Sequence, residues 1–294
     1  MAADWFYKLI IEGHEVDNSI YNDIVSIVIE DNDRFADTFS IRLSTSKLPN
    51  GDWQYLDDNK FQLFNNIIVK VGFSNGVSEY LINGYITNVM LRFGARGQQS
   101  YLELRGMDPT CIMNLEEKVV SWANVSDSDI ARRIFDSYDF EAKVDPTPIE
   151  HREDQKIVMQ RGTDIQLLKS LAKRNGFECF VQKDITTEKI IGYFGKPTLE
   201  STPQKTISVF FEEKSDITSL DVFVDSLRPL TVQSQQIDVS ENSSNEASVD
   251  SSSLPKLGQK TLSDLIRSKI ERISKPRSAP SRNLMSTIAL DPRE

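Results

Sequence analysis

A series of short β-type runs in the first 108 residues is the feature that most constrains the fold. Each run is rich in Ile, Val, Phe and Tyr, and turn-forming groups such as P-N-G-D at 49–52 separate the runs. The predicted strands are Phe6–Glu12, Ile24–Glu30, Asp37–Leu43, Ile67–Phe73, Tyr80–Arg92 and Ser100–Arg105. Short strands without a convincing helix between them predict a small β-barrel or sandwich over residues 1–108.

The hydrophobic period changes after this β-rich part. A helix is predicted over Ser126–Tyr138, because Ser126 can cap it and apolar residues recur at helical spacing. The apolar residues of this stripe are Ile130, Ile134, Phe135 and Tyr138. An extended stretch over Gln155–Arg161 follows the helix. This alternation predicts an α/β domain over residues 109–205.

The strongest local pattern in the chain begins at Thr163. Thr163 is a good N-cap with Gln166 three residues later, and Gly176 can adopt the left-handed conformation that ends a helix. Phe177–Lys183 is then a predicted strand, and Lys189–Phe194 is its predicted hairpin partner. The segment therefore predicts a helix that packs on a hairpin.

The rest of the chain combines β-type runs with polar and basic stretches. Predicted strands at Thr206–Phe211, Ser219–Val224 and Leu230–Asp238 indicate the start of a second β-barrel over 206–240. The Ser-rich segment 241–259 predicts a flexible loop or linker, because it has too few apolar residues to offset the entropy of ordering. Residues 260–294 predict a basic helical segment, with its helix over Thr261–Ile273.

Charge and the N-terminal sequence exclude several classes of protein. The net charge of -10 argues against nucleic-acid binding over most of the surface. Residues 260–294 carry eight Lys or Arg against four Asp or Glu, so this acidic chain has a basic end that either is solvated or docks on an acidic partner. No apolar run is long enough to cross a bilayer, and no secretory leader is present. We expect synthesis in the cytoplasm and no direct membrane insertion.

The side chains that usually carry chemistry are sparse. His14 and His151 are expected at the surface, and Cys111 and Cys179 are expected to be reduced, inert core thiols. Neither a serine-hydrolase motif nor a phosphate-binding loop is present, and no metal-ligand spacing occurs, so no cofactor or metal is expected. Paired carboxylates are the weakest exclusion, because they need no sequence spacing. The carboxylates considered are Glu116, Glu117, Glu150, Glu153 and Asp154, each more simply interpreted as solvated charge.

The segment Q-R-G-T-D-I-Q-L-L-K-S-L-A-K-R-N-G-F-E-C-F-V resembles the late control protein D family of contractile phage tails. The same pattern occurs in the hub part of type VI secretion spike proteins and in extracellular contractile injection particles. The matching positions are Thr163, Asp164, Leu168, Leu171, Ala172, Arg174, Gly176 and Phe177. Further pieces, including L-E-L-R-G-M-D-P and D-I-T-S-L-D-V-F-V-D-S-L-R-P, follow in the expected order, so the resemblance covers roughly residues 5–240.

The resemblance implies an α+β, mainly β, protein with two tube-like β-barrel domains and an α/β insertion between them. It also implies a baseplate hub: a homotrimer whose pseudo-sixfold ring joins the tail tube protein to the central spike protein and contacts other baseplate proteins. Such a protein is a symmetry adaptor of an assembled phage tail or injection particle, and it has no catalytic site.

Two alternatives stay open on the sequence alone. The first is a peptidoglycan glycosidase of the same apparatus that acts through two carboxylates. The second is a monomeric carbohydrate-binding module, although Trp5, Trp53 and Trp122 are scattered rather than in a row. The chain ends at A-L-D-P-R-E, before the point where family members commonly finish the second barrel, so the completeness of that barrel and the choice between phage tail and injection system stay open.

Overall fold

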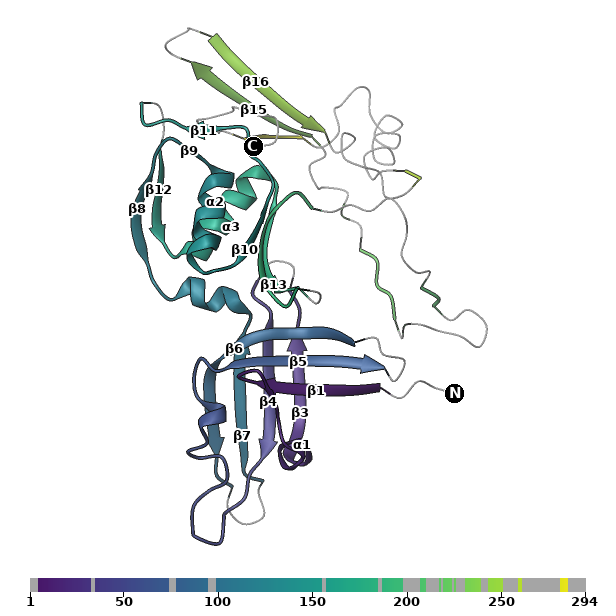
Figure 1. Cartoon of the computed structure of the whole chain (residues 1–294). Helices are drawn as coiled ribbons and strands as arrows, with labels where there is room; N and C mark the ends of the chain where they lie inside the picture. The colour runs from purple at the N-terminus through teal and green to yellow at the C-terminus, as the bar shows by residue number, and fades with distance from the viewer. Residues whose placement is uncertain are drawn as a thin grey trace. The chain divides into compact units, whose positions relative to one another are not determined.

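The structure is a computed structural model of the chain. It describes residues 5–32, 35–73, 78–94, 99–154, 157–184, 187–197, 207–209, 217, 219–223, 225, 231–238, 243–250, 259–260 and 281–284. The chain divides into two compact units (Figure 1): residues 1–173 with 177–196, and residues 174–176 with 197–294. In the described part of the chain, every helix is too short or too polar to cross a membrane.

The first unit begins with a seven-stranded antiparallel sheet. Its strands are β1 (Trp5–Ile11), β2 (His14–Glu15), β3 (Ile24–Glu30), β4 (Thr38–Ser44), β5 (Asn66–Phe73), β6 (Ser78–Arg92) and β7 (Tyr101–Met107), in the order β2-β1-β5-β6-β7-β4-β3. The six strands predicted for this region are confirmed. The short helix α1 (Asn18–Asp23) and the 3₁₀ turn η1 (Asn59–Phe61) were not predicted.

This sheet is curled but open. Its hydrogen-bonded order begins at β2 and ends at β3, and among the described strands these two ends do not pair with each other. The mainly β prediction is confirmed, whereas the barrel closure predicted for residues 1–108 is not seen. In β1 and β4, alternate residues face an apolar core, as the two-residue period of a strand requires. The fully buried members include Leu9, Ile41, Leu43, Ile67, Ile86, Leu102 and Leu104.

The rest of the first unit mixes strands with two helices. After the 3₁₀ turn η2 (Pro109–Asn114), its elements are β8 (Lys118–Trp122), β9 (Val125–Ser126), α2 (Asp127–Ser137), β10 (Glu141–Val144), β11 (Glu150–His151), β12 (Val158–Gly162), α3 (Asp164–Asn175), β13 (Glu178–Lys183) and β14 (Ile190–Gly195). The predicted hairpin is confirmed, since β13 and β14 pair antiparallel. Strand β10 adds to β14 in parallel, and β12 pairs antiparallel with β8.

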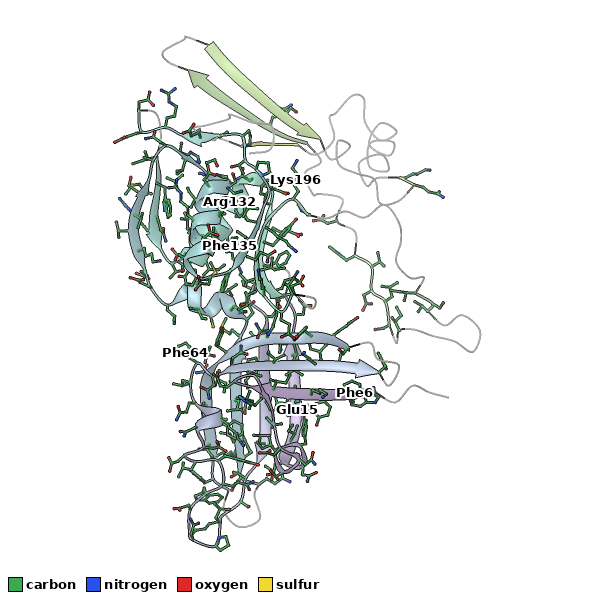
Figure 2. The ribbon with its side chains drawn as sticks, viewed as in Figure 1. Phe6, Glu15, Phe64, Arg132, Phe135 and Lys196 are labelled. Carbon is green, nitrogen blue, oxygen red and sulfur yellow. The ribbon has the colours of Figure 1, made fainter. Side chains whose placement is uncertain are left out.

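Helix α2 shows how this second core is built. Ser126 caps the helix by accepting a hydrogen bond from the backbone N–H of Asp129, and the Asp129 side chain completes a capping box. Phe135 is fully buried and lies among the helices and strands of this part (Figure 2). A Cβ atom added at Gly192 on β14 would come within 2.3 Å of the Phe135 ring. Glycine at 192 therefore lets the strand approach the helix.

The second unit contains a three-stranded sheet of β15 (Thr231–Asp238), β16 (Ser243–Asp250) and β17 (Ser281–Leu284), in the order β16-β15-β17. The strand predicted over Leu230–Asp238 is confirmed. Strand β16 lies inside the Ser-rich segment 241–259, so the prediction of a flexible loop there is wrong for residues 243–250. Main-chain pairing with β15 orders this segment and needs no apolar side chains.

Other predictions for the second unit are wrong or fall outside the described residues. Residues 207–209 and 219–223 are not in strands, so the strands predicted over Thr206–Phe211 and Ser219–Val224 are absent where the structure describes them. Strand β17 pairs in parallel with β15 and lies after the helix predicted over Thr261–Ile273, in a part of the basic end for which no strand was predicted. The helix predicted over Thr261–Ile273 lies outside the described residues. The predicted domain boundaries stay predictions.

Candidate interaction surface and family motif

The family-motif residues gather at α3 and at the turn after it. Thr163, Asp164, Leu168, Leu171 and Ala172 are buried. Arg174 is half-buried near the end of α3, Gly176 follows the helix with a φ of 64°, and Phe177 leads into β13. The predicted cap is confirmed: the Thr163 N–H donates to the Gln166 side chain at 3.2 Å, and the Gln166 N–H donates back to Thr163 Oγ1 at 3.4 Å.

Asp164 is the centre of a buried polar network, with an exposed fraction of 2%. Its Oδ2 accepts hydrogen bonds from Lys118 Nζ at 2.6 Å and from the Tyr138 hydroxyl at 2.8 Å. Its Oδ1 accepts from Gln160 Nε2 at 2.7 Å, and Gln160 Oε1 in turn accepts from Trp122 Nε1 at 3.1 Å. The network joins β8, α2, β12 and α3, so one carboxylate ties together four elements of this core.

The environment of Asp164 favours its charged form. Burial acts to raise the pKa of the carboxyl group, but the hydrogen bonds from Lys118, Gln160 and Tyr138 outweigh burial, and the pKa lies below its ordinary value. Burial, together with the hydrogen bond to Asp164, raises the pKa of the Tyr138 hydroxyl. A carboxylate with a lowered pKa that already accepts three hydrogen bonds is a weak proton acceptor. The arrangement is that of a structural cross-link.

The structure contradicts the prediction that His151 lies at the surface. It was expected at the surface, whereas the structure buries it with an exposed fraction of 7% and brings its Nε2 to 2.7 Å from Asp127 Oδ1. His151 sits on β11, which pairs with β9 one residue before α2 begins. The charged sequence around His151 hid this burial, because the contact partner lies 24 residues earlier in the chain. His14 is exposed, as predicted.

The remaining candidates for chemistry do not form a reactive constellation in the described residues. Cys111 is buried and Cys179 is half-buried; both are free, and burial raises the pKa of their thiols to about 11 and about 12. Both thiols are therefore poor nucleophiles at neutral pH. The carboxylates weighed for a glycosidase are all exposed: Glu116, Glu117, Glu150, Glu153 and Asp154. Groups of metal-ligand type do not cluster anywhere in the described part of the chain.

A groove of about 780 Å³ opens beside the first sheet and is largely apolar. Its walls come from β1, β3, β5 and β6, and include Trp5, Tyr7, Ile27, Val71, Tyr80 and Leu81. Tyr7 and Trp5 continue the face of β1 that buries Leu9, because alternate residues of a strand share one face. The apolar face of the sheet therefore runs out of the core into the groove, where Trp5 is 67% exposed.

The strands at both edges of the sheet, β2 and β3, have backbone groups without a neighbouring strand among the described residues, and β3 also lines this groove. Among the described strands, β3 has β4 as its single neighbour, and β2 pairs only with Ile10 and Ile11 of β1. Val25 and Val28 on β3 are exposed, as is Phe6 at the start of β1 (Figure 2). Open edges that carry exposed β-branched residues are templates for pairing with another chain. An extended apolar surface beside such edges is typical of a protein–protein interface.

Comparisons with known proteins give a family and a fold for the chain. A family model described as the Alg8 N-terminal domain matches residues 3–285. The chain belongs to the Alg8 N-terminal domain family. A search of curated proteins found no match.

Solved structures with a similar fold come from phage tails and from a VgrG complex. The 43 kDa tail protein of prophage MuSo2 from Shewanella oneidensis is 14% identical, with a TM-score of 0.54 over 86% of this chain and 71% of that chain. A tail protein from Neisseria meningitidis MC58 is 12% identical, with a TM-score of 0.55 over 92% of this chain and 76% of that chain.

The third similar structure is a chain of the half-lidded Francisella PdpA-VgrG complex, which is 10% identical. Its TM-score is 0.54 over 97% of this chain and 44% of that chain. At these identities the likeness concerns the fold: the chain has a fold found in phage tail proteins and in a PdpA-VgrG complex.

Proposed function

We propose that this protein is a structural hub of a contractile tail or of a related injection particle, where copies of the chain form a ring between tube and spike. The observation that carries the proposal is the fold shared with two phage tail proteins over most of both chains. The similar chain in the PdpA-VgrG complex supports a place at the spike end of such an apparatus. The order of motifs that resembles the late control protein D family is consistent with this place.

The surface of the first sheet supports self-association. An open edge at β3 and an exposed apolar groove next to it lie on the same sheet, so one neighbouring chain can cover both. Burial of this apolar surface provides the favourable free energy, and pairing of the open edges fixes the register. A ring of three such chains presents similar surfaces to a sixfold tube when each chain contributes two related β domains.

A role without catalysis is part of the proposal. The four buried carboxylates of the described residues already have partners. Asp164 accepts from three donors, and Glu103 is shared by two arginines. Asp108 accepts from the backbone N–H groups of Asp37 and Thr110, and Asp127 lies 2.7 Å from His151 Nε2. A glycosidase needs one carboxyl that can give up a proton and a second that faces the sugar. No pair with these two properties is recognisable among the described carboxylates.

Light scattering on the purified chain, alone and with its tube and spike proteins, tests the proposal. We expect a particle of three chain masses, either alone or in the mixture. A chain that stays monomeric in the presence of both proteins would contradict the hub. A peptidoglycan turbidity assay examines catalysis in parallel, and lysis that is lost on substitution of a single Asp or Glu would establish the glycosidase instead.

A further inference from the structure

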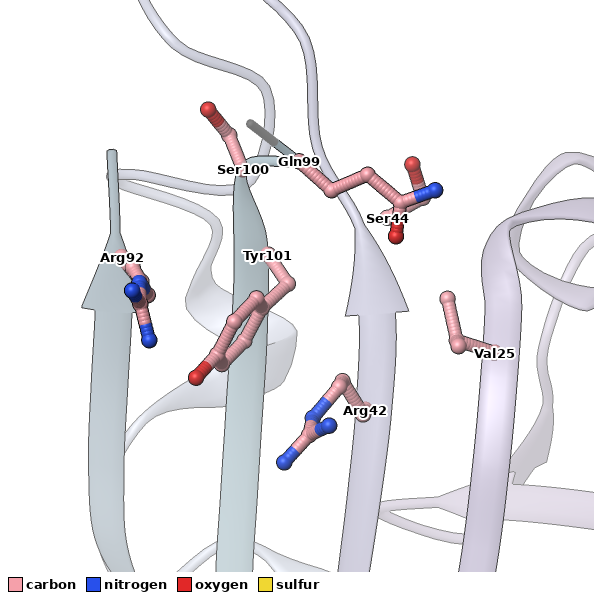
Figure 3. Close-up of a pocket in the computed structure, with 7 residues that line it drawn as sticks. All are labelled: Val25, Arg42, Ser44, Arg92, Gln99, Ser100 and Tyr101. Atoms are coloured by element: carbon pink, nitrogen blue, oxygen red, sulfur yellow. The ribbon is translucent and has the colours of Figure 1, made fainter. Parts of the chain in front are cut away.

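A small pocket of about 290 Å³ lies on the solvent face of the first sheet, opposite the core (Figure 3). Arg42 comes from β4, Arg92 from β6 and Tyr101 from β7. The strand register sets Tyr101 directly across from both Arg92 and Ser44, so these side chains share one face. Val25, Gln99 and Ser100 complete the lining.

Guanidinium groups flank the Tyr101 ring in this pocket. The Arg42 guanidinium carbon lies 4.5 Å from the ring centroid, and that of Arg92 lies 5.9 Å from it. Both distances are within the range of a cation–π contact. Tyr101 thus holds two like charges near one another on a single aromatic platform.

The positive charge at this pocket exceeds its compensation. Glu103 accepts from Arg42 Nη2 at 3.1 Å and from Arg105 Nε at 2.6 Å, and its side chain is 3% exposed. Burial acts to raise the pKa of Glu103, but the hydrogen bonds from the two arginines outweigh it and hold the pKa below its ordinary value. Within the described residues, Arg92 has no carboxylate at ion-pair distance. Glu103 is thus shared by Arg42 and Arg105, and the Arg92 guanidinium has no counter-charge within the described residues.

Arg42 adds a buried hydrogen-bond donor that has no acceptor. Its Nε is buried and has no hydrogen-bond partner in the described structure. A buried donor without an acceptor is costly, and native structures rarely leave one in place. Because Arg42 lines the pocket, an anion there can neutralise Arg92 and offer an acceptor to this donor once the Arg42 side chain reorients.

We propose that this pocket binds the carboxylate of a glutamate side chain in an acidic segment of a partner protein. Guanidinium groups bind carboxylates through paired, charge-assisted hydrogen bonds. The methylene groups of the glutamate can lie against Val25 and the Tyr101 ring. The volume is at the lower limit of small-molecule sites, so it suits one side chain rather than a cofactor.

The charge balance favours a carboxylate over a phosphate polymer. A carboxylate supplies a counter-charge for Arg92, which has none within the described residues. A nucleic acid would bring a dense array of charges against a chain whose net charge is -10. The inference goes beyond the hub proposal and does not depend on trimer formation.

NMR of arginine side-chain Nε–Hε signals on the full chain tests the inference. The probe is a capped peptide of alternating Glu and Gly, compared with the same peptide that carries Gln in place of Glu and with inorganic phosphate. We expect the Glu peptide to shift the Arg42 and Arg92 signals saturably, and the Gln peptide to leave them in place. Arg92→Gln should weaken peptide binding about tenfold, since one charged pair is lost.

Arg105→Gln is the matched control. Arg105 contacts Glu103 on the same face but does not line the pocket, so this variant should bind the peptide within about twofold of the unmodified chain. Equal shifts with the Gln peptide would overturn the inference, as would unchanged binding by Arg92→Gln. Saturation by inorganic phosphate at lower concentration than by the Glu peptide would identify a small-anion site instead, and would also overturn it.

Discussion

Asp164 contributes more to the stability of this fold than its size indicates. Three donors from three different elements converge on its two oxygens, and water reaches almost none of it. Loss of one member of a buried, charged network leaves the other members desolvated and without a partner. We expect Asp164→Asn to lower the free energy of unfolding by about 2 to 3 kcal/mol, measured by urea unfolding followed by tryptophan fluorescence.

The free energy of unfolding at low pH distinguishes the effect of the Asp164 charge from the effect of the side chain's shape. The folded pKa lies below the ordinary value of 3.8, so the unfolded chain takes up the proton first as the pH falls. Asp164 therefore stabilises the fold above that value, and this contribution is lost as the pH falls through the folded pKa. Asp164→Asn should make the free energy of unfolding depend less on pH in this range. Asp154→Asn is the control, because its ion pair with Arg152 is exposed, and it should change little.

Residue-level predictions from the sequence succeeded where the signal is local. Ser126, Thr163 and Gly176 cap or end helices as predicted, because capping depends on residues within three or four positions. Burial of His151 and the donors around Asp164 escaped prediction. Lys118 and Asp164 are 46 positions apart, and only the completed fold brings them together.

At the scale of the element, the end of α3 depends on one backbone conformation. Gly176 has a φ of 64°, and a Cβ atom added there would meet nothing within 4 Å. A substitution at this position is therefore penalised by conformation and not by crowding. We expect Gly176→Val to destabilise the chain by about 1 to 2 kcal/mol in urea unfolding, because a β-branched residue disfavours the left-handed region.

Asparagine provides the matched comparison at this helix end. It tolerates the left-handed region better than other non-glycine residues, so Gly176→Asn should lose clearly less stability than Gly176→Val. Equal losses for the two variants would show that the left-handed turn is not the origin of the effect. Unchanged stability in both would mean that the turn can adopt another conformation at no cost.

Elements with a strong hydrophobic period were predictable, and those held by distant pairing were not. The six predicted strands of the seven-stranded first sheet and helices α2 and α3 each carry an apolar face of their own. Strand β8 pairs with β12 across 44 positions from Lys118 to Gly162, and its Val119 and Val120 are exposed, so its sequence lacks a buried face. Strand β16 is mostly polar, with Ala247 and Val249 as its apolar residues, and it is joined to β15 by main-chain pairing, so its sequence carries little hydrophobic pattern.

On the scale of the whole molecule, the general fold was more predictable from the sequence than the surfaces proposed for binding. The ordered motifs resemble a tail family, and the fold agrees with tail proteins. The open edge at β3, the apolar groove and the arginine pocket arise from strand order and register. Strand order is set by contacts between runs that are far apart in sequence, and local composition does not encode it.

The edge of β3 allows a direct test of the association proposed between copies of the chain. Val28 is 51% exposed on this edge strand, and a lysine there keeps its charge in water only if the edge stays free. We expect Val28→Lys to reduce the trimer fraction about tenfold or more in light scattering at a fixed chain concentration, without loss of folding by circular dichroism. Val119→Lys is the control, because Val119 is 80% exposed on β8 and lies outside the first sheet. If Val119→Lys alone abolished the trimer, the interface would lie on the ribbon of β8 and β12, and if neither did, pairing at these two strands would not hold the ring together.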